Sequence, residues 1–167
     1  MALTSWFLGI ALLQVLAGPA YGGEFHWKPG DAPPPVAGIH LGDGRVRLEA
    51  VLGRPSGTEK LGEDALALTY RKRGVQVLYA PLDGVAIIYL LTRAAGDIGG
   101  VRLGDTRRDV LARWGDPPSV GGPMAIYGAG DWGVFVKLGE DDKVKQLGIG
   151  RITDKAPEGA KFYRKTD

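Results

Sequence analysis

Two short segments of the chain carry apolar side chains at helical spacing. The clearer segment follows Thr106, a residue suited to cap a helix, and its apolar positions are Val110, Leu111 and Trp114. Asp109 stands three residues after Thr106, where its carboxylate can complete a capping box. Gly115 can adopt the backbone that ends a helix, and two prolines follow it. The pattern predicts a helix between Thr106 and Gly115.

The earlier segment has the same apolar spacing, at Leu48, Val51 and Leu52, and the same stop signals, at Gly53 and Pro55. Its start differs, because Gly44 and Arg47 stand where the later segment has its capping threonine and its acidic residue. We therefore predict a second helix that ends like the other one but begins with a weaker cap.

Each predicted helix is followed by three short β-rich runs that Gly or Asp turns separate. The runs lie near residues 68–70, 75–77 and 85–90 in the first part of the chain, and near 125–127, 134–136 and 144–149 in the second. Runs of this length bounded by turn residues are typical of antiparallel hairpins. The predicted fold class is α+β, in units of one helix and a three-stranded antiparallel sheet.

The two units also share sequence. Residues 38–55 and 100–117 align without a gap, and identical glycine, leucine, aspartate, arginine, alanine and proline residues recur between them. Similarity of this kind predicts two copies of one supersecondary unit. We assign repeat 1 to residues 36–93, repeat 2 to residues 98–151, and a C-terminal tail to residues 152–167.

Comparison of the two copies separates the faces of the predicted sheet. One face is apolar in both copies and is assigned to the helix side, with Val75, Val77, Ile88 and Leu90 in the first copy. The other face differs: the last strand carries Ile87, Tyr89 and Leu91 in the first copy but Gln146, Gly148 and Gly150 in the second. An exposed apolar face of this size requires a cover. Either the other repeat covers it, through a shared core or joined sheets, or a partner protein does.

The candidate partner-binding residues follow from this difference. They are the open-face side chains together with one tryptophan expected at an exposed turn: Leu78, Ile87, Tyr89, Leu91, Trp132 and Phe135. The shared residues, by contrast, are turn, cap and packing residues.

The N-terminal segment has the features of an export signal. Residues 5–17 are almost wholly apolar, and Ala20 and Gly22 provide the small residues of a cleavage site. We predict a signal peptide at 1–22 and a proline-rich linker at 23–35, in which Trp27 can pack against the domain edge; an uncut membrane anchor is the alternative. A periplasmic or secreted location follows, with no integral membrane span after cleavage.

Composition excludes several kinds of chemistry. The 167 residues include no cysteine, which excludes disulfides, thiol catalysis and a lipid-modified N-terminal cysteine. The formal net charge of +2 argues against a nucleic-acid binder, and the basic run at Arg71–Arg73 is expected to be a solvated turn. His26 and His40 lack acidic partners at metal-ligand spacing. We expect no metal, no cofactor and no catalytic residue, and hence not an enzyme.

The repeated motif Gly-x-x-Leu-Gly-Asp, the later Gly-x-Pro and the tyrosines Tyr70 and Tyr127 resemble the SmpA/OmlA (BamE-like) domain of outer-membrane assembly factors. The tandem arrangement is similar to the β-lactamase inhibitor proteins. The resemblance implies a non-catalytic module that binds other proteins through its open sheet faces, in envelope assembly or in inhibition of a secreted enzyme.

The sequence therefore predicts a protein–protein interaction module whose partner is another envelope or secreted protein. The alternative is a small-ligand-binding or hydrolytic protein that uses the cleft between the repeats, with carboxylates such as Glu63 and Asp64 as acid and base.

Overall fold

The computed structural model describes residues 27–28, 30–117, 119–121, 124–128 and 130–152. The predicted signal peptide lies outside these residues, as do residues 23–26 and 29 of the predicted linker and all but one residue of the predicted tail. The helices within the described ranges include none that is long and apolar enough to cross a membrane.

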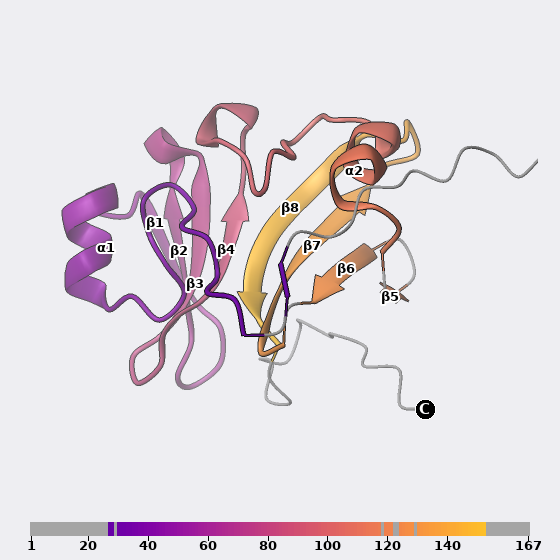
Figure 1. Cartoon of the computed structure of the whole chain (residues 1–167). Coiled ribbons are helices and arrows are strands. Elements are labelled where there is room, and N and C mark those ends of the chain that lie inside the picture. The colour runs from indigo at the N-terminus through magenta and orange to yellow at the C-terminus, as the bar shows by residue number, and fades with distance from the viewer. Residues whose placement is uncertain (1–26, 29, 118, 122–123, 129, 153–167) are drawn as a thin grey trace, which may run out of the picture.

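One antiparallel sheet forms the centre of the fold (Figure 1). Its strands lie in the order β1-β2-β3-β4-β8-β7-β6-β5. Their bounds are β1 Gly57–Lys60, β2 Leu66–Tyr70, β3 Val75–Ala80, β4 Gly84–Leu90, β5 Ser119–Gly121, β6 Met124–Gly128, β7 Trp132–Leu138 and β8 Val144–Arg151. The helices are α1 (Arg45–Leu52) and α2 (Arg107–Trp114), and two 3-10 turns are η1 (Arg71–Arg73) and η2 (Arg93–Ala95). The predicted α+β class is confirmed.

The sheet differs from the predicted pair of three-stranded units in two respects. A fourth short strand, β1 or β5, pairs at the outer edge of each half. The two halves are continuous, because β4 pairs with β8 and places Ile88 opposite Ile149. Gly42 donates to the Val85 carbonyl at 2.8 Å, as Gly104 donates to the Val144 carbonyl at 2.8 Å. The duplication itself stays a prediction.

The two helices begin as their sequences indicate. Thr106 and Asp109 form a complete capping box, in which each side chain accepts a hydrogen bond from the other residue's backbone N–H. The Thr106 hydroxyl also donates to the Asp109 carboxylate at 2.7 Å, and this bond, followed by the one from the Thr106 backbone N–H, lowers the pKa of Asp109. Helix α1 begins at Gly44 without a side-chain cap. Both caps, the strong and the weak, are therefore predicted correctly.

The main core lies between the helices and one face of the sheet. Figure 1 shows α1 at the β1 end of the sheet and α2 at the end that contains β6 and β7. Leu48 and Leu52 of α1 and Val110 and Trp114 of α2 belong to one buried cluster with the inward-facing strand residues. Those residues include all the positions assigned to the helix side from the sequence, which confirms the assignment of faces.

Trp27, which precedes the isolated β-bridge between Val36 and Ile39, packs against the same core. The Trp27 ring lies 5.6 Å from the Trp132 ring and 6.3 Å from the Trp114 ring, centroid to centroid. The Trp132 indole donates a hydrogen bond to the Asp31 carbonyl at 2.7 Å. Trp132 is only 2% exposed, so its predicted place at an exposed turn is wrong. Trp27 and Asp31 contact it, and packing of Trp27 against the domain edge is what the sequence permitted.

Candidate functional site on the open sheet face

The face of the sheet opposite the helices carries its own small apolar cluster. Across the strands, hydrogen-bonded register places Gln76, Tyr89, Gly148 and Phe135 in one row. The neighbouring row contains Leu78, Ile87 and Gly150. Because β4 and β8 are paired, the apolar residues of the first half lie directly beside the glycines of the second.

Most of the predicted binding residues on this face are buried. Ile87 and Phe135 are each 2% exposed, and Leu78 is 9% exposed. They form a cluster with Ala67, against which Tyr89, Met124 and Ile126 pack from the sides. The prediction that Leu78, Ile87 and Phe135 offer a free binding surface is therefore wrong for this structure. Of the two alternatives given for their cover, joined sheets with a shared core is the one observed.

Two glycines of β8 make this self-covering possible. A methyl group added at Gly148 would collide with the Phe135 ring and with the Ile88 carbonyl oxygen. A methyl group added at Gly150 would lie 3.0 Å from Cγ1 of Ile87. The larger side chains thus lie over positions that have no side chain. In the sequence, Gly148 and Gly150 stand where the first copy has apolar residues. In the structure, they leave the room that Phe135 of the second half and Ile87 of the first half occupy.

Tyr89 and Leu91 remain accessible at one border of this cluster. The Tyr89 ring meets the Phe135 ring edge to face, with centroids 5.2 Å apart and an angle of 62° between the planes. Burial raises the pKa of the Tyr89 hydroxyl. The structure contains no hydrogen bond from this hydroxyl to another described residue. Leu91 is 44% exposed.

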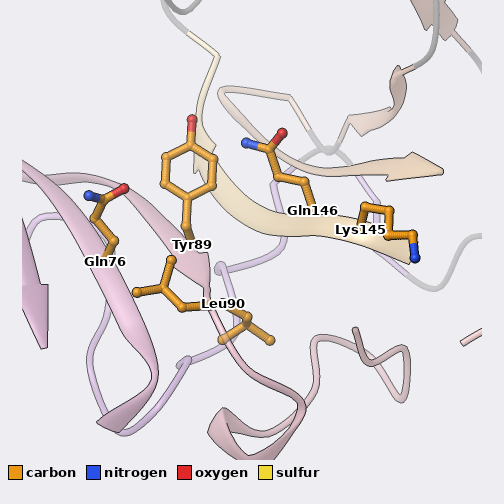
Figure 2. A pocket seen from close by; sticks show the side chains of 6 residues that line it. Gln76, Tyr89, Leu90, Lys145 and Gln146 are labelled. Carbon is orange, nitrogen blue, oxygen red and sulfur yellow. The ribbon is translucent and has the colours of Figure 1, made fainter. Parts of the chain in front are cut away.

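A hollow of about 300 Å³ opens beside Tyr89, at the junction of the two halves. It is lined by Gln76, Tyr89, Leu90, Leu91, Lys145 and Gln146. Figure 2 shows the Tyr89 ring between Gln76 of β3 and Gln146 of β8, with Lys145 further along β8. The hollow combines one aromatic ring, two amides that can donate and accept hydrogen bonds, and one cation. We call these residues the Tyr89 hollow.

The polar groups of the Tyr89 hollow are partly engaged. The Gln76 amide donates to the Thr69 hydroxyl at 3.2 Å. The Lys145 ammonium lies 2.9 Å from a carboxylate oxygen of Asp141, and it is the main cause of the lowered pKa of Asp141. Gln76, Lys145 and Gln146 were not among the binding residues predicted from the sequence. The alternation of β3 and β8 does place Gln76 and Gln146 on the open face, so the signal for those two was present.

The carboxylates considered from the sequence as acid and base do not line the hollow. Its lining includes no carboxylate, and Glu63 and Asp64 lie in the connection between β1 and β2. Within the described part of the chain, no group of three or more His, Asp or Glu side chains could hold a metal ion. The residues of the Tyr89 hollow can contact another molecule and form hydrogen bonds with it.

Comparison with known proteins identifies the fold. No family model matches the chain, and no curated protein matches it. Its structure is similar to that of a cysteine-rich secretory protein from Staphylococcus aureus subsp. aureus Mu50, with a TM-score of 0.58, 12% identity, 78% of this chain covered and 50% of that chain. It is also similar to YjgB, a DUF4309 family protein from Bacillus subtilis subsp. subtilis strain 168, with a TM-score of 0.51, 16% identity, 79% of this chain covered and 90% of that chain.

These likenesses show the fold alone, and the chain spans about half the length of the staphylococcal protein. They also correct the resemblance inferred from the sequence. No SmpA/OmlA model matches, and the similar structures are of a secretory protein and a DUF4309 protein. The shared motif misled because Gly42 and Gly104 have φ values of 87° and 84°. Glycine is favoured wherever a turn needs that backbone, so the motif reports turn geometry rather than membership of a family.

Proposed function

We propose that this protein is an exported, non-catalytic module that binds another secreted or envelope protein through the Tyr89 hollow. The observation that carries the proposal is the position of Tyr89. Its ring packs on Phe135, and the residue lines a hollow to which neither helix contributes a side chain. Aromatic side chains with a polar tip are enriched at the centres of protein interfaces, where the ring is buried and the hydroxyl finds a partner.

The surroundings of Tyr89 support the same role. Gln76 and Gln146 flank the ring with uncharged donors and acceptors, and Leu91 adds exposed apolar surface. The buried cluster beneath, with Ile87 and Phe135, holds the tyrosine on rigid sheet rather than on a loop. A preorganised aromatic anchor with a polar border is the usual composition of an interface centre.

Export rests on the sequence and on one neighbour. The apolar segment at 5–17 with small residues at a cleavage site predicts secretion. The staphylococcal protein of similar fold is described as secretory. An exported protein meets partners that lie outside the cytoplasm as well. We therefore expect the partner to be an extracellular or envelope protein.

The small-ligand alternative predicted from the sequence would have to use the same place, because the Tyr89 hollow is where the two halves meet. The hollow is at the lower limit of the volumes typical of ligand pockets. It lacks carboxylates, and its single ammonium is already paired with Asp141. These features favour contact with a protein surface over enclosure of a small substrate.

The test introduces charge into the hollow. Tyr89→Glu and Gln146→Glu are compared with Leu82→Glu, which adds the same charge at a residue that is 95% exposed and lies at the β3–β4 turn. Each tagged variant is incubated with extract from the exported fraction of the native host, and the retained proteins are identified by mass spectrometry. We expect the two hollow variants to lose a protein that the wild type and Leu82→Glu retain.

Circular dichroism and the urea midpoint establish that each variant is folded. Gln146→Glu guards against a folding defect, since Gln146 is a partly exposed polar residue whose replacement leaves the apolar cluster intact. An identical set of retained proteins for all folded variants would remove the hollow as the binding site.

A further inference from the structure

The turn between β2 and β3 presents a compact group of positive charges. Turn η1 consists of Arg71, Lys72 and Arg73, and all three are exposed. Arg54, also exposed, follows α1 and stands two residues before Ser56, whose hydroxyl accepts a hydrogen bond from the backbone N–H of Arg71 at 3.1 Å. We call these four residues the basic tip.

The turn has a fixed shape. The Arg73 guanidinium donates to the Val51 carbonyl at 3.4 Å, near the end of α1. Gly74 ends the turn with a φ of 65°, and a methyl group there would collide with the Thr92 side chain. The charges are therefore carried on a defined turn that packs against α1 and against the start of η2.

The cations of the basic tip are not held in ion pairs. None of its four cations forms an ion pair with a described residue. Several cations elsewhere do form ion pairs, among them Arg45 with Glu49, Arg93 with Asp105 and Arg107 with Asp142. Four uncompensated positive charges thus gather at one place on a chain whose formal net charge is +2.

The charge is also distributed unequally between the ends of the sheet. Because β4 and β8 are antiparallel, the β2–β3 turn and the β6–β7 turn lie at opposite ends. The β6–β7 turn carries Asp131, which is exposed. The β7–β8 turn shares the end of the basic tip. Its Asp141 and Asp142 are paired with Lys145 and Arg107, and its Glu140 is exposed and has no ion pair with a described residue. The four cations of the basic tip therefore outnumber the one unpaired carboxylate of that turn.

An exposed apolar side chain adjoins the charges. The backbone N–H of Leu91 donates to the Gly74 carbonyl at 2.7 Å, which places Leu91 directly beside the turn. Leu91 is 44% exposed. Basic side chains next to an exposed aliphatic group are the combination that binds at the headgroup level of an anionic membrane.

We propose that the basic tip docks this protein on a membrane surface rich in anionic phospholipid, with the β6–β7 end pointing away. A lipid surface fits the observations better than a soluble polyanion, because the cations form one compact projection rather than a stripe that a polymer could follow. Leu91 borders both this surface and the Tyr89 hollow, but the four cations lie outside the hollow's lining, so the docking does not depend on the proposed partner binding.

The test measures partition of the purified protein into sedimenting vesicles. One set contains phosphatidylcholine and phosphatidylglycerol at 2:1, and the other contains phosphatidylcholine alone. The vesicles of phosphatidylcholine alone measure binding that does not depend on anionic lipid, including any binding by the apolar N-terminal segment where it is retained. Arg71→Gln/Lys72→Gln removes two charges of the tip, and Lys60→Gln/Arg151→Gln removes two exposed charges from the β6–β7 end as a matched control.

Each cation close to an anionic surface contributes about 1 kcal/mol, which is about a fivefold change in partition. We therefore expect the tip variant to bind the mixed vesicles roughly 25-fold more weakly than wild type, and the control variant to bind within about twofold of it. Wild-type binding should fall steeply with added salt, and Tyr89→Glu should bind as wild type does.

Three results would overturn the proposal. Wild-type protein could show no preference for the anionic vesicles. The tip and control variants could lose binding equally, which would show an effect of net charge alone. The protein could bind soluble polyphosphate through the tip and ignore the vesicles, which would assign the tip to a polymer.

Discussion

Two equivalent tyrosines provide a direct test of how this core is held together. Tyr127 and Tyr70 both occupy the strand that precedes the central hairpin of their half, and both are almost fully buried, at 1% and 2% exposure. The Tyr127 hydroxyl donates a hydrogen bond to the Gly115 carbonyl at 3.1 Å, at the end of α2. The Tyr70 hydroxyl has no hydrogen-bond partner among the described residues. Replacement of each tyrosine by phenylalanine removes one hydroxyl and little else.

The expected effects differ in size and direction. Tyr127→Phe leaves the Gly115 carbonyl without this donor, and an unsatisfied buried polar group costs about 1–3 kcal/mol. Tyr70→Phe removes a hydroxyl that gains nothing from burial, so the free energy of unfolding should stay the same or rise by about 1 kcal/mol. The hydroxyl of Tyr70 lies in the field of Arg45 and Glu49, and its pKa is raised mainly by burial.

Urea unfolding followed by circular dichroism measures the difference. With a slope of about 2 kcal/mol per molar urea, Tyr127→Phe should lower the midpoint by roughly 0.5–1.5 M. Tyr70→Phe should leave the midpoint unchanged or raise it. The slopes of the three proteins must agree, because a changed slope would report a changed denatured state.

Equal destabilisation of the two variants would refute the reasoning. It would mean that the Tyr70 hydroxyl has a partner in solution, or that the hydrogen bond to Gly115 contributes nothing. A larger loss for Tyr70→Phe than for Tyr127→Phe would reverse the assignment of the supported and the unsupported hydroxyl.

Two further predictions concern pH and packing. Burial, together with the nearby Asp116 carboxylate, raises the pKa of Tyr127 to about 12. An unfolded tyrosine ionises near pH 10, so stability should fall by up to about 1.4 kcal/mol per unit between pH 10 and 12. Urea midpoints across that range should fall less in Tyr127→Phe, and an equal fall would contradict the assignment. Gly148→Val should cost about 1–3 kcal/mol by collision with Phe135, whereas Gly57→Val on the edge strand β1, where a methyl would lie 3.8 Å from Thr69, should leave the midpoint nearly unchanged. Equal midpoints for the two valine variants would contradict the explanation that Phe135 packs over Gly148 because glycine leaves room for its ring.

The helices and the inward face of the sheet were predictable because their causes are local. Thr106 and Asp109 form their capping box within a single turn. Val75 and Val77 alternate with open-face residues along one strand, which period-two alternation requires. Strand β1 was missed because it is short, polar and exposed throughout, so its sequence shows no apolar alternation.

The candidate site was predicted only in part. The sequence placed Tyr89 and Leu91 on the open face, where the structure leaves them accessible. It placed Ile87 and Phe135 on the same face but could not show that they are buried, since their cover comes from strands distant in the chain. The four charges of the basic tip include Arg54, which the sequence separates from Arg71 and a hydrogen bond at Ser56 brings close.

By itself the sequence determined where the helices start and stop, where the hairpins turn, and which side of each strand faces the helices. These features depend on side chains within a few residues of one another, through caps, glycine turns and alternation. Tertiary structure alone decided that β4 pairs with β8 and that Phe135 lies over Gly148. It also decided that Trp132 is covered by a segment 101 residues earlier in the chain. Burial of a strand's outer face depends on which strand becomes its neighbour, and that choice is made by packing across the whole sheet.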